Sequence, residues 1–231
     1  MIILDSMKKI KLISAAFGSN QKELVINSSL SHSDYTVEVV LYNDSNTPSR
    51  ANSLHPRLKG KIPKMLEWIE SPGYDYYIWV DGTFTIFDGF LENIMEFADQ
   101  DVDLFLFEHT RRNSIQAELQ NLNGKIITGN PYMHDRYGGE RMAHQVSLYL
   151  SDKGFVDNHL FFGGCLMYTN KLVENRNYNL MTDWFFHNTI YSVMDQLSLP
   201  YLIQKHRTKY KVYPHVLMRN KFLVHDFSIF Y

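Results

Sequence analysis

Short apolar segments with strand character alternate with helix-like segments along the chain, and this alternation restricts the possible folds more than any other feature. It is typical of an α/β fold in which helices flank a mainly parallel central sheet. Neither an internal repeat nor a Gly/Ser-rich linker divides the sequence. We therefore predict a single Rossmann-like domain over residues 1–231. The expected strands cover residues 9–16, 36–42, 76–80, 102–107, 159–168, 210–213 and 222–224.

Start signals mark some of the expected helices, whereas one long stretch has no helical pattern. Pro63 suits the first turn of a helix, and Asp88 can cap the start of another. The stretch 113–141 is rich in Gly and Asn and has no clear period, so we expect a long loop that acts as a lid. Helical character is expected over residues 20–30, 63–69, 88–97, 140–150 and 171–194.

Charge and cysteine content exclude several classes of protein. The net charge of −2 argues against a nucleic-acid binder that depends on a strong positive field. The single cysteine, Cys165, excludes an intramolecular disulfide framework and a cysteine-based zinc cluster. No apolar run reaches the roughly 18–20 residues of a membrane span, and the first charges follow apolar residues, unlike those of a signal peptide. We expect a cytoplasmic protein, with a peripheral position at the inner face of a membrane as the alternative.

The residues that follow the expected strands are the first candidates for a binding site, because ligands of open α/β sheets bind outside the carboxyl ends of the strands. Ala16 ends the first strand and Asp44 follows the second, so both are candidates for contact with a ligand. Glu108 and His109 follow the fourth strand, where either is a candidate acid–base group or acceptor contact. An ordinary charged loop is the alternative there.

The strongest candidate is the strand at 76–80, which runs directly into Asp81, Gly82 and Thr83. A carboxylate in this position suits a metal–diphosphate site, because Mg²⁺ and Mn²⁺ are typically held by one or two carboxylates and by substrate phosphates. Gly82 would let a ligand approach the backbone closely. An Asp-Gly turn that ends the strand explains the same residues without a ligand.

This segment resembles the metal-binding stretch of GT-A-fold glycosyltransferases, in which an apolar strand delivers an Asp-x-Asp motif. It is most similar to glycosyltransferase family 8 and to the domain-of-unknown-function 616 family. In this resemblance Asp81 takes the place of the first Asp and Asp88 that of a later one, whereas Thr83 stands where family 8 has its second Asp. The resemblance implies a metal site with one carboxylate fewer, to which the Thr83 hydroxyl or a bound water can contribute.

Basic residues precede the Asp81 strand. The stretch 55–59 is similar to the His-Pro-Arg-x-Lys stretch of the 616 family. Arg57, Lys61 and Lys64 can neutralise a nucleotide diphosphate, Arg with a bidentate fork and Lys as a point charge. The alternative is a solvated basic start of a helix.

Three later segments resemble family 8 in their order. Gly163 and Gly164 correspond to a small-residue pair that would let sugar or acceptor lie against the strand, with a strand bulge as the alternative. Asp195 and Gln196 match an Asp-Gln-Asp motif that faces the anomeric carbon in that family, with a surface helix position as the alternative. His225 matches the histidine that completes the family's metal site, although a lone histidine is often structural.

The resemblance implies a glycosyltransferase that moves a sugar from a UDP- or GDP-sugar to a glycan or another hydroxyl acceptor. The implied cofactor is Mn²⁺, or Mg²⁺, held by Asp81 and His225. Asp195 is the base if the enzyme inverts, and with Gln196 it stabilises an oxocarbenium-like state if the enzyme retains. Residues 9–110 would form the nucleotide-binding half, and residues 111–231 the acceptor half with the metal-completing C-terminus.

Two other functions fit the same residues. A non-catalytic protein that binds a nucleotide or nucleotide sugar is favoured by Thr83, which removes one expected metal ligand. A metal-dependent hydrolase would use Asp81, Glu108, His109 and His225 and would act without a nucleotide.

Overall fold

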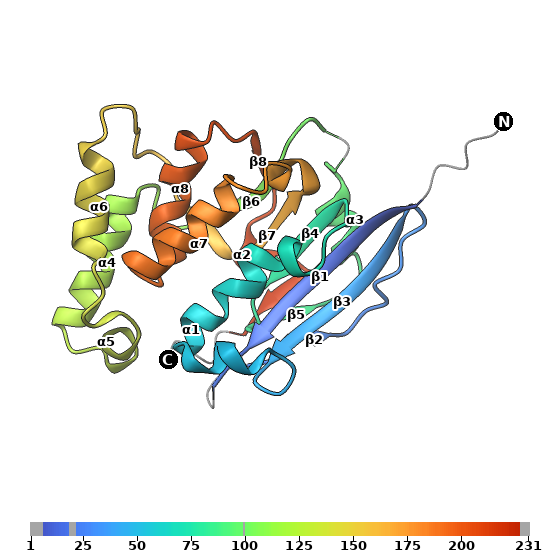
Figure 1. The fold of residues 1–231 in the computed structure, drawn as a ribbon, viewed down its shortest axis with the longest axis horizontal. Helices are drawn as coiled ribbons and strands as arrows, with labels where there is room; N and C mark the ends of the chain where they lie inside the picture. The colour runs from blue at the N-terminus through green and yellow to red at the C-terminus, as the bar shows by residue number, and fades with distance from the viewer. Residues whose placement is uncertain (1–6, 19–21, 99, 227–231) are drawn as a thin grey trace.

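A mixed six-stranded sheet forms the centre of the protein in the computed structural model, which describes residues 7–18, 22–98 and 100–226 (Figure 1). Its order is β3 (Tyr35–Asn43), β1 (Lys8–Ala16), β4 (Tyr76–Val80), β7 (Phe161–Thr169), β6 (Leu104–Glu108) and β8 (Tyr210–Val212). β1 is parallel to β3 and β4, and β6 is parallel to β8, while β7 runs antiparallel between β4 and β6. The predicted α/β fold with a mainly parallel sheet is confirmed.

A second, three-stranded sheet lies beside the end of β4. It consists of β2 (Val25–Ile26), β5 (Phe84–Ile86) and β9 (Leu223–His225), with β5 parallel to β2 and antiparallel to β9. β5 starts four residues after the last residue of β4, so β9 brings the C-terminal part of the chain close to Asp81.

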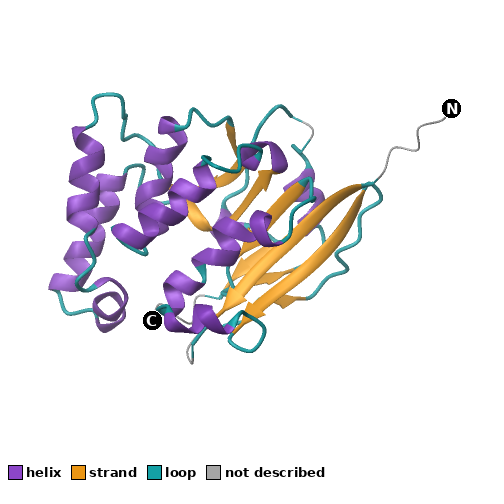
Figure 2. Cartoon of the chain, viewed as in Figure 1, coloured by secondary structure: helices purple, strands orange, loops and turns teal. Residues whose placement is uncertain are grey.

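Helices pack against the sheet, and further helices form a group beside it (Figure 2). One apolar cluster joins β1, β4, β6 and β7 to three α-helices, and a second joins the other face of the sheet to one α-helix and the small sheet. All five residues of β4 are buried, which explains its continuous apolar run. No helix within the described ranges is long and apolar enough to cross a membrane. The helices are η1 (Ser49–Ser53), α1 (Pro56–Lys59), α2 (Lys61–Glu70), α3 (Phe90–Met95), α4 (Ile115–Ile127), α5 (Pro131–Tyr137), α6 (Met142–Ser151), η2 (Asn170–Val173), α7 (Leu180–Ile190), α8 (Asp195–Lys205) and η3 (Leu217–Arg219).

The expected lid loop at 113–141 is wrong, because most of this stretch is helical. The Ser114 side chain accepts a hydrogen bond from the backbone N–H of Ala117, and the Asp157 carboxylate accepts two more at the start of α4. The Asn130 side chain caps α5, whose first residue is Pro131. These caps satisfy the free backbone N–H groups at the starts of the two helices. The apolar pattern of the stretch is irregular and did not indicate a helix.

Two other helical predictions also need correction. Residues 22–30 contain the strand β2 and coil, because Val25 and Ile26 pair with β5; residues 19–21 lie outside the described part. The segment 171–194 is interrupted before α7, which begins at a capping box made by Asn179 and Thr182. The helix expected from Asp88 begins instead at Phe90, after Gly89 in a left-handed conformation.

A buried polar chain links α6 and α7. Ser192 Oγ donates to Gln145 Oε1 (2.7 Å), and Gln145 Nε2 donates to the Tyr149 hydroxyl (3.0 Å). The same hydroxyl lies 2.5 Å from His187 Nδ1. Burial, together with the charges of Lys205 and His206, lowers the pKa of His187 to about 4, although Asp183 opposes the shift.

We predict that His187 makes the fold sensitive to acid. Its pKa is about 4 in the folded protein and about 6.5 in the unfolded chain. The folded state therefore binds fewer protons at His187 than the unfolded chain does. The contribution of His187 to stability is fully present above pH 6.5 and is lost as the pH falls toward 4. Urea unfolding of H187Q across this pH range should show a smaller loss of unfolding free energy, by up to about 3 kcal/mol, than the parent.

The control variant is H144Q, which changes an exposed histidine near the same helices. Some acid sensitivity should remain in H187Q, since burial, with the charges of Arg112 and Arg111, also lowers the pKa of His109 to about 4. An unchanged pH dependence in H187Q would contradict the prediction.

Candidate functional site

Asp81 is fixed at the carboxyl end of β4. Its backbone N–H donates to the carbonyl of Gly164 (2.7 Å), and its Oδ1 accepts from the indole N–H of Trp79 (2.6 Å). A Cβ at Gly82 would lie only 1.9 Å from the carbonyl oxygen of Lys22, so this position tolerates no side chain without a shift of the backbone. Gly82 is thus needed for chain packing, which was not the reason that the sequence suggested.

The centre of the site is a buried ion-pair cluster of Lys61, Lys64 and Asp195. Both lysines lie on α2 and approach the same oxygen, Asp195 Oδ2, at 2.8 and 2.5 Å. Lys64 Nζ also donates to the carbonyl of Gly163 (2.6 Å). The indole N–H of Trp184 donates to the backbone carbonyl of Asp195 (3.0 Å). Residues more than 130 positions apart in sequence thereby meet at the start of α8.

Gly163 makes room for this cluster. A Cβ there would lie 3.2 Å from both Lys64 Nζ and an Asp195 carboxylate oxygen. Lys64 is 2% exposed, and its ammonium lies over the rings of Trp79 (5.6 Å) and Trp184 (5.4 Å), which favours a cation. A Cβ at the neighbouring Gly164 would meet the ring of Phe84 at 2.8 Å. Both glycines therefore face protein side chains.

The cluster carries an excess of positive charge. Burial raises the pKa of the Asp195 carboxyl, but the charges and hydrogen bonds of Lys61 and Lys64 lower it more, so the pKa lies well below its usual range. Burial and the charge of Lys64 lower the pKa of Lys61, against the charges of Asp195 and Asp81. Asp81 is therefore within electrostatic reach of the cluster.

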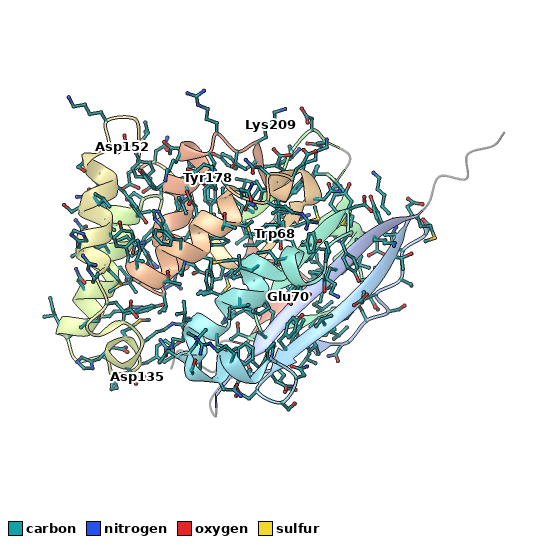
Figure 3. All side chains as sticks on the ribbon, in the orientation of Figure 1. Trp68, Glu70, Asp135, Asp152, Tyr178 and Lys209 are labelled. Carbon is teal, nitrogen blue, oxygen red and sulfur yellow. The ribbon has the colours of Figure 1, made fainter. Side chains whose placement is uncertain are left out.

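Helix α5, which falls in the stretch that we expected to be a lid loop, is joined to α1. Its Asp135 forms an ion pair with Arg57 of α1 (3.6 Å), and Figure 3 labels Asp135 between α5 and α1. Arg136 donates to the Tyr132 hydroxyl, and its guanidinium lies over the rings of Tyr132 and Tyr137. The signals that could have revealed this helix are the Asn-Pro start and the Tyr132–Arg136 spacing of one helical turn.

His225 lies on β9, near Asp81. It is 5% exposed, pairs with Phe84 between β9 and β5, and meets that ring edge-on at 4.8 Å. Burial lowers the pKa of His225, while the charges of Asp81 and Asp226 oppose the shift. His225 and Asp81 are thus neighbours, as the sequence suggested.

The expected Mn²⁺ or Mg²⁺ does not fit this donor set well. Among the described residues, no group of three or more His, Cys, Asp or Glu side chains could hold a metal ion. Asp81 and His225 are two ligands at most, and one oxygen of Asp81 already accepts a hydrogen bond from Trp79. A divalent cation in proteins usually has a larger oxygen-rich shell.

The remaining predicted residues lie outside the Lys61–Lys64–Asp195 cluster. Asp44 Oδ2 accepts from Gly18 N (2.8 Å) and its Oδ1 from Lys59 Nζ (2.6 Å), beyond the end of β1, where Ala16 is half-buried. Gln196 is half-buried beside Asp195. Glu108 is exposed, and its described ion pair joins it to His159 (3.6 Å) and to no residue of the cluster. Asp88 lines a separate hollow with Asn93, His215, Lys221 and Phe222.

No protein-family model matches the chain and no curated protein matches it, so membership in family 8 or the 616 family stays a prediction. The chain is similar to the solved structure of a glycosyltransferase involved in the glycosylation of the major capsid of PBCV-1 (TM-score 0.44, 10% identity, 95% of this chain and 93% of that chain). It is also similar to mouse xyloside xylosyltransferase 1 in its apo form (TM-score 0.45, 7% identity, 88% of this chain and 84% of that chain). Likenesses this low leave the function to be inferred from the site itself.

We predict that the Lys64–Asp195 pair is energetically coupled. K64M removes one of the two cations that compensate a buried carboxylate, so it should lower the free energy of unfolding by about 3 kcal/mol. In the double variant K64M/D195N the loss should be smaller than the sum of the single losses, as measured by urea unfolding. K125M, at an exposed position on α4, is the control and should change stability little. Additive single losses would show that the pair contributes no coupling.

Proposed function

We propose that the protein transfers a sugar from a nucleotide-diphosphate sugar to a hydroxyl acceptor. The observation that carries this proposal is the buried Lys61–Lys64–Asp195 cluster beside Asp81, with more cations than carboxylates, at the carboxyl end of a parallel strand. Phosphates are the common ligands of such strand ends in α/β folds, and a cationic site with low solvent access favours an anionic ligand.

The donor diphosphate would lie against Arg57 and Lys61. The Nη1 atom of Arg57 is buried and has no hydrogen-bond partner among the described residues, so a guanidinium donor is available for a phosphate oxygen. Asp44 and Ala16 lie where the nucleoside would bind, beyond the end of β1. Gly163 and Gly164 are not expected to touch the donor, because side chains already fill the space that they leave.

Asp195 is the carboxylate proposed to lie nearest the anomeric carbon. A carboxyl whose pKa is held well below its usual range is a weak proton acceptor, so a role as general base is disfavoured. It stays anionic and can stabilise the positive charge that develops on the sugar, with Gln196 beside it. The bond between the anomeric carbon and the diphosphate oxygen breaks, its electron pair leaves with the diphosphate, and the acceptor oxygen forms the new bond. The acceptor proton passes to the leaving phosphate.

Leaving-group stabilisation is assigned to protein cations in this proposal, because Asp81 and His225 alone form an incomplete metal site. The same incompleteness weighs against the metal-dependent hydrolase. A glycan acceptor is proposed from the motif resemblance. Glu108 is not included, since its described contacts lie away from the cluster.

A nucleotide-binding protein without catalysis is the second candidate. It is favoured by the tight neutralisation of Asp195, which leaves no basic carboxylate in the cluster. Binding without any turnover of nucleotide sugars would support this candidate.

We predict that UDP or GDP raises the melting temperature of the protein, since a ligand that binds the folded state alone stabilises it.

D195N should reduce the release of UDP or GDP from a panel of nucleotide sugars by about 100-fold or more, while nucleotide affinity changes by less than about tenfold. The matched control is D183N, which removes a carboxylate that pairs with Lys205 and His206 on the outside of α7. An equal loss of nucleotide affinity and turnover in D195N would contradict the assigned role.

A further inference from the structure

Arg136 is a fourth cation, close enough to Asp81 to interact with its charge, and it comes from a helix that the proposed function does not use. α5 is joined to α1 by the Asp135–Arg57 ion pair and faces it in the view of Figure 1. Further along the chain, the Glu140 carboxylate accepts a hydrogen bond from the N–H of Val193 (3.3 Å), two residues before Asp195. The segment 131–140 is therefore tied to α1, which precedes the helix of the two lysines, and to the residues just before Asp195.

The side chain of Arg136 is held in place but keeps unused donor capacity. Its guanidinium carbon lies 5.5 Å from the ring centre of Tyr132 and 5.4 Å from that of Tyr137, and one terminal nitrogen bonds the Tyr132 hydroxyl. Its Nε is buried and has no hydrogen-bond partner in the described part of the chain. A buried guanidinium N–H without a partner is costly unless a ligand satisfies it.

The charge environment points in the same direction. Burial lowers the pKa of Arg136, but Tyr137, Tyr132 and the charge of Asp81 raise it above its usual value. Burial raises the pKa of Tyr137 to about 12; the charge of Arg136 opposes this shift and the charge of Asp195 adds to it. Arg136 and Tyr137 are thus within electrostatic reach of the two carboxylates of the site.

We propose that Arg136 binds the donor diphosphate beside Asp81 and supplies the positive charge that the incomplete metal site does not. This inference rests on the proposed function. A guanidinium can hold two phosphate oxygens at once and remains charged at any physiological pH. It therefore stabilises the departing diphosphate without a metal ion.

The charge balance of the site agrees with this assignment. The proposed site contains four cations (Arg57, Lys61, Lys64 and Arg136) and two carboxylates (Asp81 and Asp195). A third carboxylate, Asp135, pairs with Arg57 but is left out of this balance because its side chain is 85% exposed. The excess of two positive charges matches a diphosphate ester, which carries one negative charge on each phosphate. Without Arg136 the site would have half of this excess.

Binding of UDP, GDP and inorganic pyrophosphate, measured by calorimetry on the full chain in EDTA and in a Mn²⁺ series, tests the proposal. The parent should bind a diphosphate equally well in EDTA and in Mn²⁺. R136M should bind it about 10- to 100-fold more weakly in EDTA, and R136K should recover part of the loss because it keeps the charge. R141M is the matched control: Arg141 is exposed and lies over Tyr191, and its removal should leave binding unchanged.

The outcomes separate this inference from the proposed function. Nucleotide binding that requires Mn²⁺ and is unaffected in R136M overturns the role of Arg136 and leaves the sugar-transfer proposal standing. Arg136-dependent binding of pyrophosphate without binding of UDP or GDP supports the diphosphate site and overturns the nucleotide-sugar donor. Failure of all three ligands to bind in every condition overturns both.

Discussion

The interaction on which the site depends is the buried contact of Lys61 and Lys64 with a single oxygen of Asp195. It connects α8 to α2, the helix that precedes β4 and Asp81. β7 joins the same contact through the carbonyl of Gly163, which accepts a hydrogen bond from Lys64. Removing charges from water is costly, so such a cluster persists only where geometry and further hydrogen bonds compensate. The Trp184 indole, which bonds the Asp195 backbone, and the absence of a side chain at Gly163 both serve this geometry. Elements that are distant in the sequence are thereby fixed around one point.

The sequence predicted the sheet well because its evidence is local. β4 is a continuous apolar run with Asp81 at its end, and the strands predicted over residues 9–16 and 36–42 correspond to β1 and β3. The short strand β2 was missed because its two residues are recognised as a strand only by their pairing with β5. α5 was missed for a different reason: its stability comes from the Asn130–Pro131 cap and from contacts with α1, which no apolar period reveals.

Some candidate site residues were predicted correctly as neighbours, and the contacts of others were not foreseen. The motif resemblance selected Lys61, Lys64 and Asp195 separately, and the structure brings them into contact. It also selected Asp81 and His225, which are neighbours. It could not foresee that the two glycines of β7 accommodate protein side chains, or that Glu108 pairs with His159, since both facts depend on long-range packing. Arg136 carried no motif, although its position one turn after Tyr132 is a local signal for a helical contact.

The aromatic residues explain how the site tolerates its excess of positive charge before a ligand arrives. An uncompensated buried cation is unfavourable, and no carboxylate is described in contact with Arg136. Aromatic faces instead lie under Arg136 (Tyr132 and Tyr137). Rings also lie under Lys64 (Trp79 and Trp184) and Lys59 (Phe17, 4.5 Å), each of which pairs with a carboxylate as well. Ring quadrupoles attract cations by about 0.5–2 kcal/mol each without neutralising their charge. A carboxylate in contact with Arg136 would satisfy its charge and also repel a diphosphate, whereas the two tyrosine rings hold the guanidinium in place and leave its charge available to an anion.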